Sequence, residues 1–499
     1  MTDLVANLTF GFGLALSPQN LLFCLIGALL GTLVGVLPGL GPVATIAMLL
    51  PITFTLEPIP ALIMLAGLYY GAQYGGSTTA ILVNIPGESS SVVTCIDGHQ
   101  MARQGRAGAA LTIAALSSFF AGTVATAVVA AFSAPLVLIA NTFTSPDYFG
   151  LLVFGLIAAI VLAQGSVLRS VAMVVAGLIL GSVGTDIASG QIRFTFGINA
   201  LADGIGFVPV AMGLFGVAEI IRNLEVTRGR AVMQPLTSLW PTRAEVRAAW
   251  PAALRGTGVG SILGVLPGGG ALIAAFSSYV VEKKVSRTPE RFGRGAVEGV
   301  AAPEAANNAG AQTSFIPLLS LGVPPNPVMA LMLGAMTIHG IVPGPKLMID
   351  RPDLFWSMIA SMWVGNLMLV VINLPLIGIW VKLLSVPYRW LYPAILIFCC
   401  IGVYSVNNTV DDVILMCVFG LVGYVLPKIG CEPAPLILGF ILAPMIEENF
   451  RRSLIVSRGN WMVFLEKPIC AGFLALSVLF LLAVLLPAIR SQRDEAFKG

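Results

Sequence analysis

The chain has 499 residues, of which 57% are hydrophobic and 10% are charged, and its formal net charge is +3. Charged residues make up about 25% of an ordinary soluble domain. A water-soluble globular protein is therefore excluded, because so few charges could not cover its surface, and a lipid bilayer is the solvent that suits the chain. The many Gly and Pro residues lie inside apolar runs, as they do in broken and closely packed membrane helices.

The basic residues indicate which loops face the cytoplasm. No Lys or Arg precedes Arg103, and clusters follow at 222–255, at 283–294 and in the tail from Arg490. Such clusters mark cytoplasmic loops by the positive-inside rule. The start of the chain lacks the basic region of a cleaved signal peptide, so we expect the first hydrophobic run, from about Leu21, to be retained in the membrane.

The first unusual element is residues 31–41, GTLVGVLPGLG. Proline removes an amide donor and glycine permits sharp turns, so we expect a broken apolar helix whose turn contains Pro38, Gly39 and Gly41. Freed amides at a half-helix N-terminus favour anions and freed carbonyls favour cations, and transporters use both near the membrane midplane. The alternative is a simple packing kink.

A polar run follows at 69–100, and it stays partly apolar. Its Gly, Ser, Thr and Asn residues offer hydroxyls, amides and close backbone approach, with a second helix break at 84–91. Glu88 is a candidate proton or sodium site, since ionisable residues inside membranes tend to be functional; the alternative is a position at a loop mouth. The candidate ligands in this run are Gly76, Ser77, Thr78, Thr79, Asn84, Gly87, Glu88 and Ser89.

Apolar stretches long enough to span a bilayer recur along the rest of the chain. At about 20 residues for a simple span, we expect roughly ten to fourteen spanning or re-entrant segments. The fold class predicted is an all-α polytopic membrane protein.

The chain contains an internal repeat. Residues 260–270, GSILGVLPGGG, match residues 31–41 at seven of eleven positions, and 313–316 match 78–81 more weakly. This predicts a first membrane repeat at 1–221, a cytoplasmic connection at 222–250, a second membrane repeat at 251–488 and a cytoplasmic tail at 489–499.

The two repeats are expected to have inverted topology, with the N-terminus outside. The second copy of the repeated segment is flanked by basic stretches, whereas the matching flanks of the first copy contain no Lys or Arg. If both basic flanks are cytoplasmic, residues 256–281 form a re-entrant hairpin with Pro267, Gly268 and Gly270 at its turn. The alternative is an ordinary crossing.

A polar stripe in the second repeat is the counterpart of the first polar run. Glu304, Asn307 and Asn308 share one helical face, and Asn308 shares a face with Gln312. We expect the stripe to face a cavity or another helix, with interhelical hydrogen bonding as the purely structural alternative. The remaining candidate ligands here are Thr313, Pro324 and Asn326.

Several sequence patterns of enzymes are missing. The chain has no GxxxxGK[ST] segment for nucleotide hydrolysis, and no HExxH or GxSxG segment. The seven cysteines have no metal-binding spacing. No catalytic residue, metal site, cofactor or nucleic-acid partner is therefore predicted, and a gradient of sodium or protons is expected to drive transport. A membrane enzyme acting on lipids and a passive channel are the competing classes.

The motifs resemble the large membrane subunit of the tripartite tricarboxylate transporters. The resemblance spans nearly the whole chain and is carried by residues 35–41, 49–54, 70–87, 97–108, 339–345 and 448–468. Asn460 departs from the Asp expected after Gly at that position.

This resemblance implies a bacterial inner-membrane transporter with three components: this chain, a small membrane subunit and a periplasmic solute-binding protein. The binding protein would deliver a small carboxylate such as a tricarboxylate. Two polar helix breaks, around 75–90 and 304–326, are expected to meet near the membrane midplane, braced or gated by the LPG segments at 37–39 and 266–268. One repeat-built unit would move against the other helices as an elevator.

Overall fold

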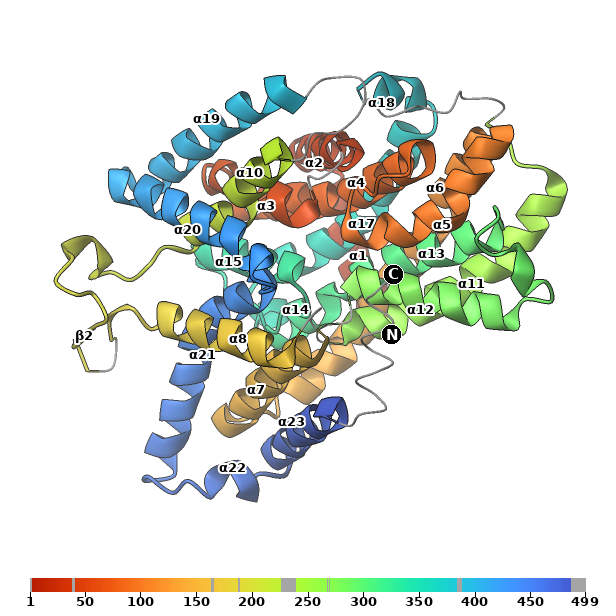
Figure 1. The fold of residues 1–499 in the computed structure, drawn as a ribbon. Coiled ribbons are helices and arrows are strands. Elements are labelled where there is room, and N and C mark those ends of the chain that lie inside the picture. The colour runs from red at the N-terminus through yellow and green to blue at the C-terminus, as the bar shows by residue number, and fades with distance from the viewer. Residues whose placement is uncertain are drawn as a thin grey trace.

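The computed structural model of the chain describes residues 2–37, 41–162, 166–186, 189–225, 239–266, 268, 270–383 and 388–485. These residues are almost entirely helical, which confirms the predicted helical class (Figure 1). The strands among them are β1 (Gly184–Thr185) and β2 (Ile192–Arg193), which pair antiparallel. They lie in a loop that projects from the helical body in Figure 1.

The first half of the chain contains the following helices: α1 (Thr2–Ala15), α2 (Pro18–Val36), α3 (Pro42–Phe54), α4 (Pro58–Val83), η1 (Ser89–Ser91), α5 (Val92–Met101), η2 (Ala102–Arg106), α6 (Ala107–Ala140), α7 (Ser145–Leu162), α8 (Val167–Gly181), η3 (Asn199–Leu201), α9 (Phe207–Ala211), η4 (Met212–Val217) and α10 (Ala218–Glu225).

The second half contains α11 (Arg243–Val265), α12 (Gly270–Val285), η5 (Pro289–Arg291), α13 (Glu298–Thr313), α14 (Phe315–Leu321), α15 (Pro327–Ile338), α16 (Leu347–Asp350), α17 (Pro352–Asn373), α18 (Ile377–Leu383), α19 (Tyr388–Asn407), α20 (Val410–Lys428), α21 (Pro433–Val456), α22 (Val463–Glu466) and α23 (Pro468–Leu485).

Several of these helices are long and apolar enough to cross a bilayer. By length and composition, the candidate spans in the described part of the chain are Pro18–Val36, Ser89–Ala140, Phe207–Glu225, Pro352–Asn373 and Val410–Lys428. Shorter apolar helices include Pro42–Phe54 and Pro327–Ile338. This arrangement is that of a polytopic membrane protein, whose spanning elements must satisfy their backbone polar groups internally.

The helices group into three parts in Figure 1. α11, α12 and α13 pack together on one side, α7, α8, α21 and α23 pack on another, and α19 and α20 lie on a third. α6 packs on α13, α4 packs on α2, and α4 and α6 also contact each other and α17.

One end of the molecule carries the basic loops. Arg106 forms an ion pair with Glu245, and both line one open cleft with Arg291 and Arg294. Gln104 Nε2 also donates a hydrogen bond of 2.9 Å to the carbonyl of Arg294. We call this end, defined by Arg106, Glu245, Arg291 and Arg294, the basic end.

α11 and α12 form a hairpin that starts and finishes near this end. The guanidinium of Arg255 pairs with Glu282 at 2.6 Å, although 27 residues separate them along the chain. At 1.5 Å per residue the pair lies about 15–18 Å from the ends of both helices at residues 265 and 270. That depth is about half of a 30 Å hydrocarbon core. α3, in contrast, diverges from α2 and packs against α4, α15 and α19.

Close helix contacts are made at matching positions of the repeated sequence. A Cβ atom on Gly31 of α2 would lie 2.2 Å from the carbonyl oxygen of Leu68 on α4. A Cβ atom on Gly260 of α11 would lie 2.3 Å from the carbonyl oxygen of Ala306 on α13. Only glycine permits such contact between helix backbones.

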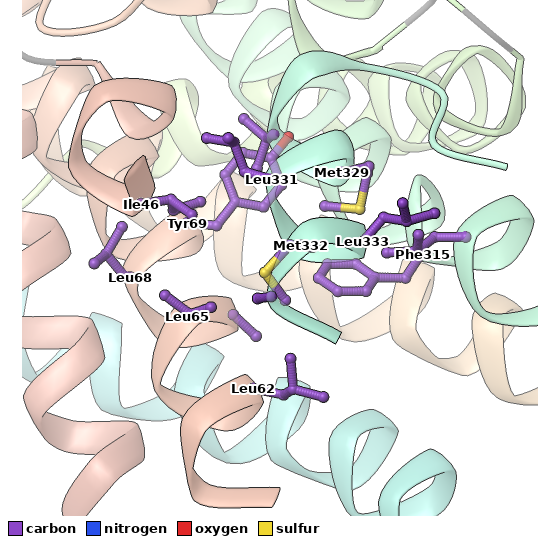
Figure 2. Packing of buried hydrophobic residues seen from close by; sticks show 14 of the residues in the cluster. Ile46, Leu62, Leu65, Leu68, Tyr69, Phe315, Met329, Leu331, Met332 and Leu333 are labelled. Carbon is purple, nitrogen blue, oxygen red and sulfur yellow. The ribbon is translucent and has the colours of Figure 1, made fainter. Parts of the chain in front are cut away.

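An apolar core joins the two halves of the chain. Figure 2 shows Leu62, Leu65 and Tyr69 of α4 opposite residues such as Met332 of α15 and Phe315 of α14. These side chains are almost completely buried. The core fixes α4 against α14 and α15, and so holds the two polar helix breaks described below in place.

Candidate functional site

A buried carboxylate lies where α4, α5, α6 and α13 meet. Glu304 is only 1% exposed, and its Oε2 accepts hydrogen bonds from the hydroxyls of Ser77 at 2.8 Å and Ser118 at 3.3 Å. Thr94 donates a third hydrogen bond, to Oε1. Three hydroxyl donors around two carboxylate oxygens suit the ionised form, which can only accept.

A second buried carboxylate lies in the neighbouring helix break. Asn307, one turn beyond Glu304 on α13, donates a hydrogen bond of 3.3 Å from Nδ2 to Oε1 of Glu88. Ser90 contacts the Glu88 carboxylate and donates to Asn307 Oδ1 at 2.8 Å. Glu88, in the first half of the chain, therefore contacts Asn307 on α13. Glu304, on the same face of α13, contacts Ser77 in the first half.

The local sequence explains the first break. α4 ends at Asn84, whose φ of 59° is left-handed, a conformation that Asn tolerates better than most residues. Glu88 then caps the next helical segment, in a capping box with Ser91. Gly87 packs tightly between the helices, since a Cβ there would lie 2.0 Å from the carbonyl oxygen of Gly35.

The second break has the same construction. α14 ends at Gly322, whose φ is 73°, and two prolines precede Asn326, which caps α15 by accepting the amide of Met329 at 3.0 Å. The amide of Gly268 donates a hydrogen bond of 2.6 Å to the carbonyl of Pro325. The turn between α11 and α12 is thus fastened to the second break.

Hydroxyls of α4 and of Ser314 satisfy backbone groups of the helices that precede the LPG segments. Thr79 Oγ1 donates 2.8 Å to the carbonyl of Val36, and Ser314 Oγ donates 3.1 Å to the carbonyl of Gly264. Carbonyls in a last helical turn lack partners within their helix. Thr79 and Ser314 therefore each donate to a carbonyl near the end of a helix, at corresponding places in the two halves.

Asn308 and Asp97 hold these elements in register. Asn308 Nδ2 donates 2.7 Å to Ser118 Oγ, which orients that hydroxyl toward Glu304. Asp97, at the basic end and fully buried, accepts the amides of Gly293, Gly295 and Ala296 at 2.8–2.9 Å. Because α13 begins at Glu298, Asp97 on α5 fixes the start of the helix that carries Glu304.

The structure brings together many of the predicted site residues. Ser77 and Asn308 bond to Glu304 or to its partner Ser118, and Glu88 bonds to Asn307 on the same face of α13. In the second break Gly268 bonds to Pro325, next to Asn326, and a Cβ on Gly270 would lie 3.5 Å from Asn326 Cβ.

Other predicted residues lie beside these clusters. Thr78 and Thr313 bond to carbonyls of their own helices, Gly76 packs on Glu88, and Pro324 is buried in the second break. Gln312 is buried with its Oε1 unpartnered, Asn84 and Ser89 are exposed, and Gly41 precedes α3. Pro38, Gly39 and Pro267 lie outside the described residues.

The breaks are shorter than predicted. α4 remains helical through Ser77, Thr78 and Thr79 up to Val83, and α13 remains helical through Thr313. The residues outside helices are 84–88 and 322–326. The side chains of Ser77 and Glu304 therefore project from rigid helices, which position them better than loops would.

Sequence reasoning missed Thr94, Ser118 and Asn373. Ser118 lies in the apolar run 110–140, where a pair of serines was the available signal. Asn373, at the end of α17, lines a small cavity beside Glu304 together with Tyr74, Ser77, Thr78 and Ser118. Within the described part of the chain, no group of three or more His, Cys, Asp and Glu side chains could hold a metal ion.

A further charge cluster lies in the C-terminal half of α21. Arg451 and Arg452 pair with Glu447 and Glu448 one turn earlier on α21, and Arg451 also pairs with Asp186 at 2.9 Å. Arg193 of β2 joins the same network through Glu447 at 2.7 Å. The projecting loop of β1 and β2 is thereby anchored to α21.

The amino-acid sequence is similar to one protein family and to two proteins of one bacterium. The family model described as "Tripartite tricarboxylate transporter TctA family" matches residues 21–438. An Agrobacterium vitis protein described as "Uncharacterized 52.8 kDa protein in TAR-I ttuC' 3'region" is 58% identical over 498 residues, covering 100% of this chain and 99% of the relative. A second protein of that organism, described as "Uncharacterized protein in TAR-II ttuC' 3'region", is 59% identical over 238 residues, covering 48% of this chain and 98% of the relative. No solved structure matches the chain.

Proposed function

Because the chain belongs to the tripartite tricarboxylate transporter TctA family, the large membrane subunits of these transporters, we propose that it is a permease that imports small carboxylates such as tricarboxylates, driven by a sodium or proton gradient. Membership makes the chain a multi-pass membrane transport protein of a bacterial family and not an enzyme. The cargo, the driving gradient and the mechanism are the parts that we propose.

The cluster around Glu304 and Glu88 carries the proposal. Its hydroxyls, amides and carboxylates come from segments more than 200 residues apart and are buried among apolar helices. Polar and ionisable groups inside a membrane protein are costly, and they commonly mark the path of a substrate or ion. The second break leads into the N-terminus of α15, and the partial positive charge of such a helix end suits an anionic solute.

The two halves of the chain are proposed to be inverted repeats. The glycine contacts of Gly31 and Gly260, the carbonyl bonds of Thr79 and Ser314, and the left-handed helix ends at Asn84 and Gly322 occur in the same order in both halves. The hairpin of α11 and α12 opens toward the basic end, which we place in the cytoplasm by the positive-inside rule.

Alternating access is proposed to occur by an elevator movement. The mobile unit would contain the two helix breaks and their supporting helices, α2, α4, α11 and α13. The peripheral group of α7, α8, α21 and α23, which packs together by its own apolar side chains, would belong to the scaffold. Movement of one repeat-built unit against the rest of the protein is a common design in secondary transporters.

Two partners are proposed to complete the transporter, because a tripartite system contains other subunits. One is a small membrane subunit, and the other is a periplasmic solute-binding protein that hands over the carboxylate. The exposed apolar faces of α19 and α20 are compatible with lipid or with the small subunit.

Reconstitution tests the proposed function. Proteoliposomes that contain this chain and its two partners should accumulate a radiolabelled tricarboxylate above its external concentration when a sodium or proton gradient is imposed. Omission of the binding protein should abolish that accumulation. Equilibration without accumulation would indicate a channel, and the absence of any carboxylate flux with all three components present would contradict the proposal.

A further inference from the structure

A small cavity lies against the carboxylate of Glu304. Its polar lining consists of Tyr74, Ser77, Thr78, Ser118, Glu304 and Asn373, from four different helices. The cavity has a volume of about 10 Å³. Measured in the same way, one water molecule needs about 10–15 Å³. The cavity has room for one water molecule or one small ion, and it excludes an organic carboxylate.

One residue of the lining, Asn373, carries a buried oxygen that has no hydrogen-bond partner. Asn373 is 3% exposed, and its Nδ2 donates to the carbonyl of Leu369 at 2.9 Å and to Thr32 Oγ1 at 3.4 Å. Since a carbonyl oxygen can only accept, the amide group is fixed in this orientation. Asn373 Oδ1 is left as a buried acceptor without a donor, and an unpaired buried acceptor requires a ligand or carries a free-energy cost.

The charge of Glu304 is also uncompensated by protein groups. None of the ion pairs formed by the described residues includes Glu304 or Glu88. Glu88 caps a helical segment, whose N-terminus offers partial positive charge. Glu304 lies in the middle of α13, where the helix offers no such compensation, while Ser118 and Thr94 donate to it as they would to an ionised group.

We propose that this cavity binds one monovalent alkali cation, sodium, through the Glu304 carboxylate, Asn373 Oδ1 and the hydroxyl oxygens of Ser77 and Ser118. Oxygen ligands are those that hard cations take. A single carboxylate balances one positive charge, which favours a monovalent over a divalent ion. The inference rests on the proposed function, because the bound cation would be the coupling ion. It would be held by the face of α13 from which Asn307 contacts Glu88.

Cation-dependent stability of the purified chain tests this site without any transport assay. The melting temperature of the full-length chain in detergent should rise with sodium chloride and not with potassium chloride at equal ionic strength, because a ligand that binds only the folded state stabilises it. Glu304→Gln and Asn373→Leu should each weaken the apparent sodium affinity by about tenfold or more. Ser361→Ala, at a buried serine of α17 that bonds only to Met358, is the matched control and should behave as the wild type.

Direct binding of radioactive sodium to the purified chain distinguishes the remaining outcomes. Saturable binding that Asn373→Leu and Glu304→Gln both reduce supports the site. Equal stabilisation by sodium and potassium, or sodium binding unchanged in both variants, would overturn it and leave a water molecule in the cavity. If uptake by the reconstituted transporter were intact in that case, the cation site alone would be rejected; if no carboxylate were transported at all, the proposed function would fail independently.

Discussion

Ser77 on α4 donates a hydrogen bond of 2.8 Å to Oε2 of Glu304 on α13, across 227 residues of sequence. Both side chains are buried, so the bond is shielded from water and joins the first half of the chain to the second. A hydrogen bond to a charged group contributes about 1.5–3 kcal/mol. This contact therefore fixes the separation of two helices and sets the electrostatics of the site.

Removal of the hydroxyls around Glu304 is predicted to impair transport. Ser77→Ala and Ser118→Ala each delete one donor to the carboxylate, and a loss of about 1.5–3 kcal/mol corresponds to roughly a tenfold or greater loss of uptake rate. Uptake in proteoliposomes, corrected for the amount of reconstituted protein, measures the effect. Thr126→Ala is the control, because Thr126 is buried on the same helix as Ser118 and bonds only to the carbonyl of Gly122. Equal uptake in all three variants would contradict the role of these hydroxyls.

The contact of α11 with α13 is predicted to tolerate no side chain at Gly260. Alanine there would place a Cβ 2.3 Å from the carbonyl oxygen of Ala306, so the helices must separate. We expect destabilisation by about 1–3 kcal/mol or more. Gly258 lies on the same helix, is exposed and has open space around it, so Gly258→Ala should be tolerated. Melting temperatures of the two variants in one detergent make the comparison, and similar values would refute the close packing.

The sequence predicted the elements that depend on composition and local pattern. Gly, Pro and Asn signals placed both helix breaks, and the spacing of Glu304, Asn307 and Asn308 correctly put them on one helical face. It could not predict that Ser118 and Asn373 face Glu304, because each lies in an apolar run whose orientation is set by packing against distant helices. The sequence also could not show that Asn84 is exposed, because a local pattern does not distinguish an exposed helix cap from a buried one; its role as a ligand stays a prediction.

Asp97 is predicted to be a positioning residue for α13. Asp97→Ala would leave the amides of Gly293, Gly295 and Ala296 without their acceptor, at a cost of about 1–3 kcal/mol for each stranded donor. We expect faster proteolysis of the segment that joins α12 to α13, together with lower uptake. Tyr279→Phe removes only one hydrogen bond to Asp97, of 2.9 Å, and should have a much smaller effect. If the proteolysis rates of both variants equalled that of the wild type, Asp97 would have no such role.

The ion pair at the basic end is predicted to make stability depend on pH. Burial alone would raise the pKa of Glu245, but the guanidinium of Arg106 and the hydrogen bonds from Thr242 hold that pKa below its usual value of 4.5. Because the folded-state pKa is the lower one, the stabilisation is complete above about pH 4.5 and is lost as the pH falls through the folded-state pKa. Wild type and Glu245→Gln should therefore differ in melting temperature at neutral pH and converge in acid. A difference that persists unchanged in acid would contradict the assignment.

The hairpin of α11 and α12 is predicted to enter and leave the membrane on one side. Arg255 and Glu282 pair at 2.6 Å, about half a bilayer from the turn, so the residues before and after the hairpin should share the cytoplasmic face. Arg247→Cys and Arg287→Cys, each in a chain without its seven native cysteines, should react with a membrane-impermeant thiol reagent only when the cytoplasmic face is accessible. Phe196→Cys, in the projecting loop and 89% exposed, supplies the reference for the opposite face, because the apolar stretch Phe207–Glu225 separates it from the basic end. Labelling of positions 247 and 287 from opposite faces would show that this segment crosses the membrane, and the inverted-repeat proposal would then fail with it.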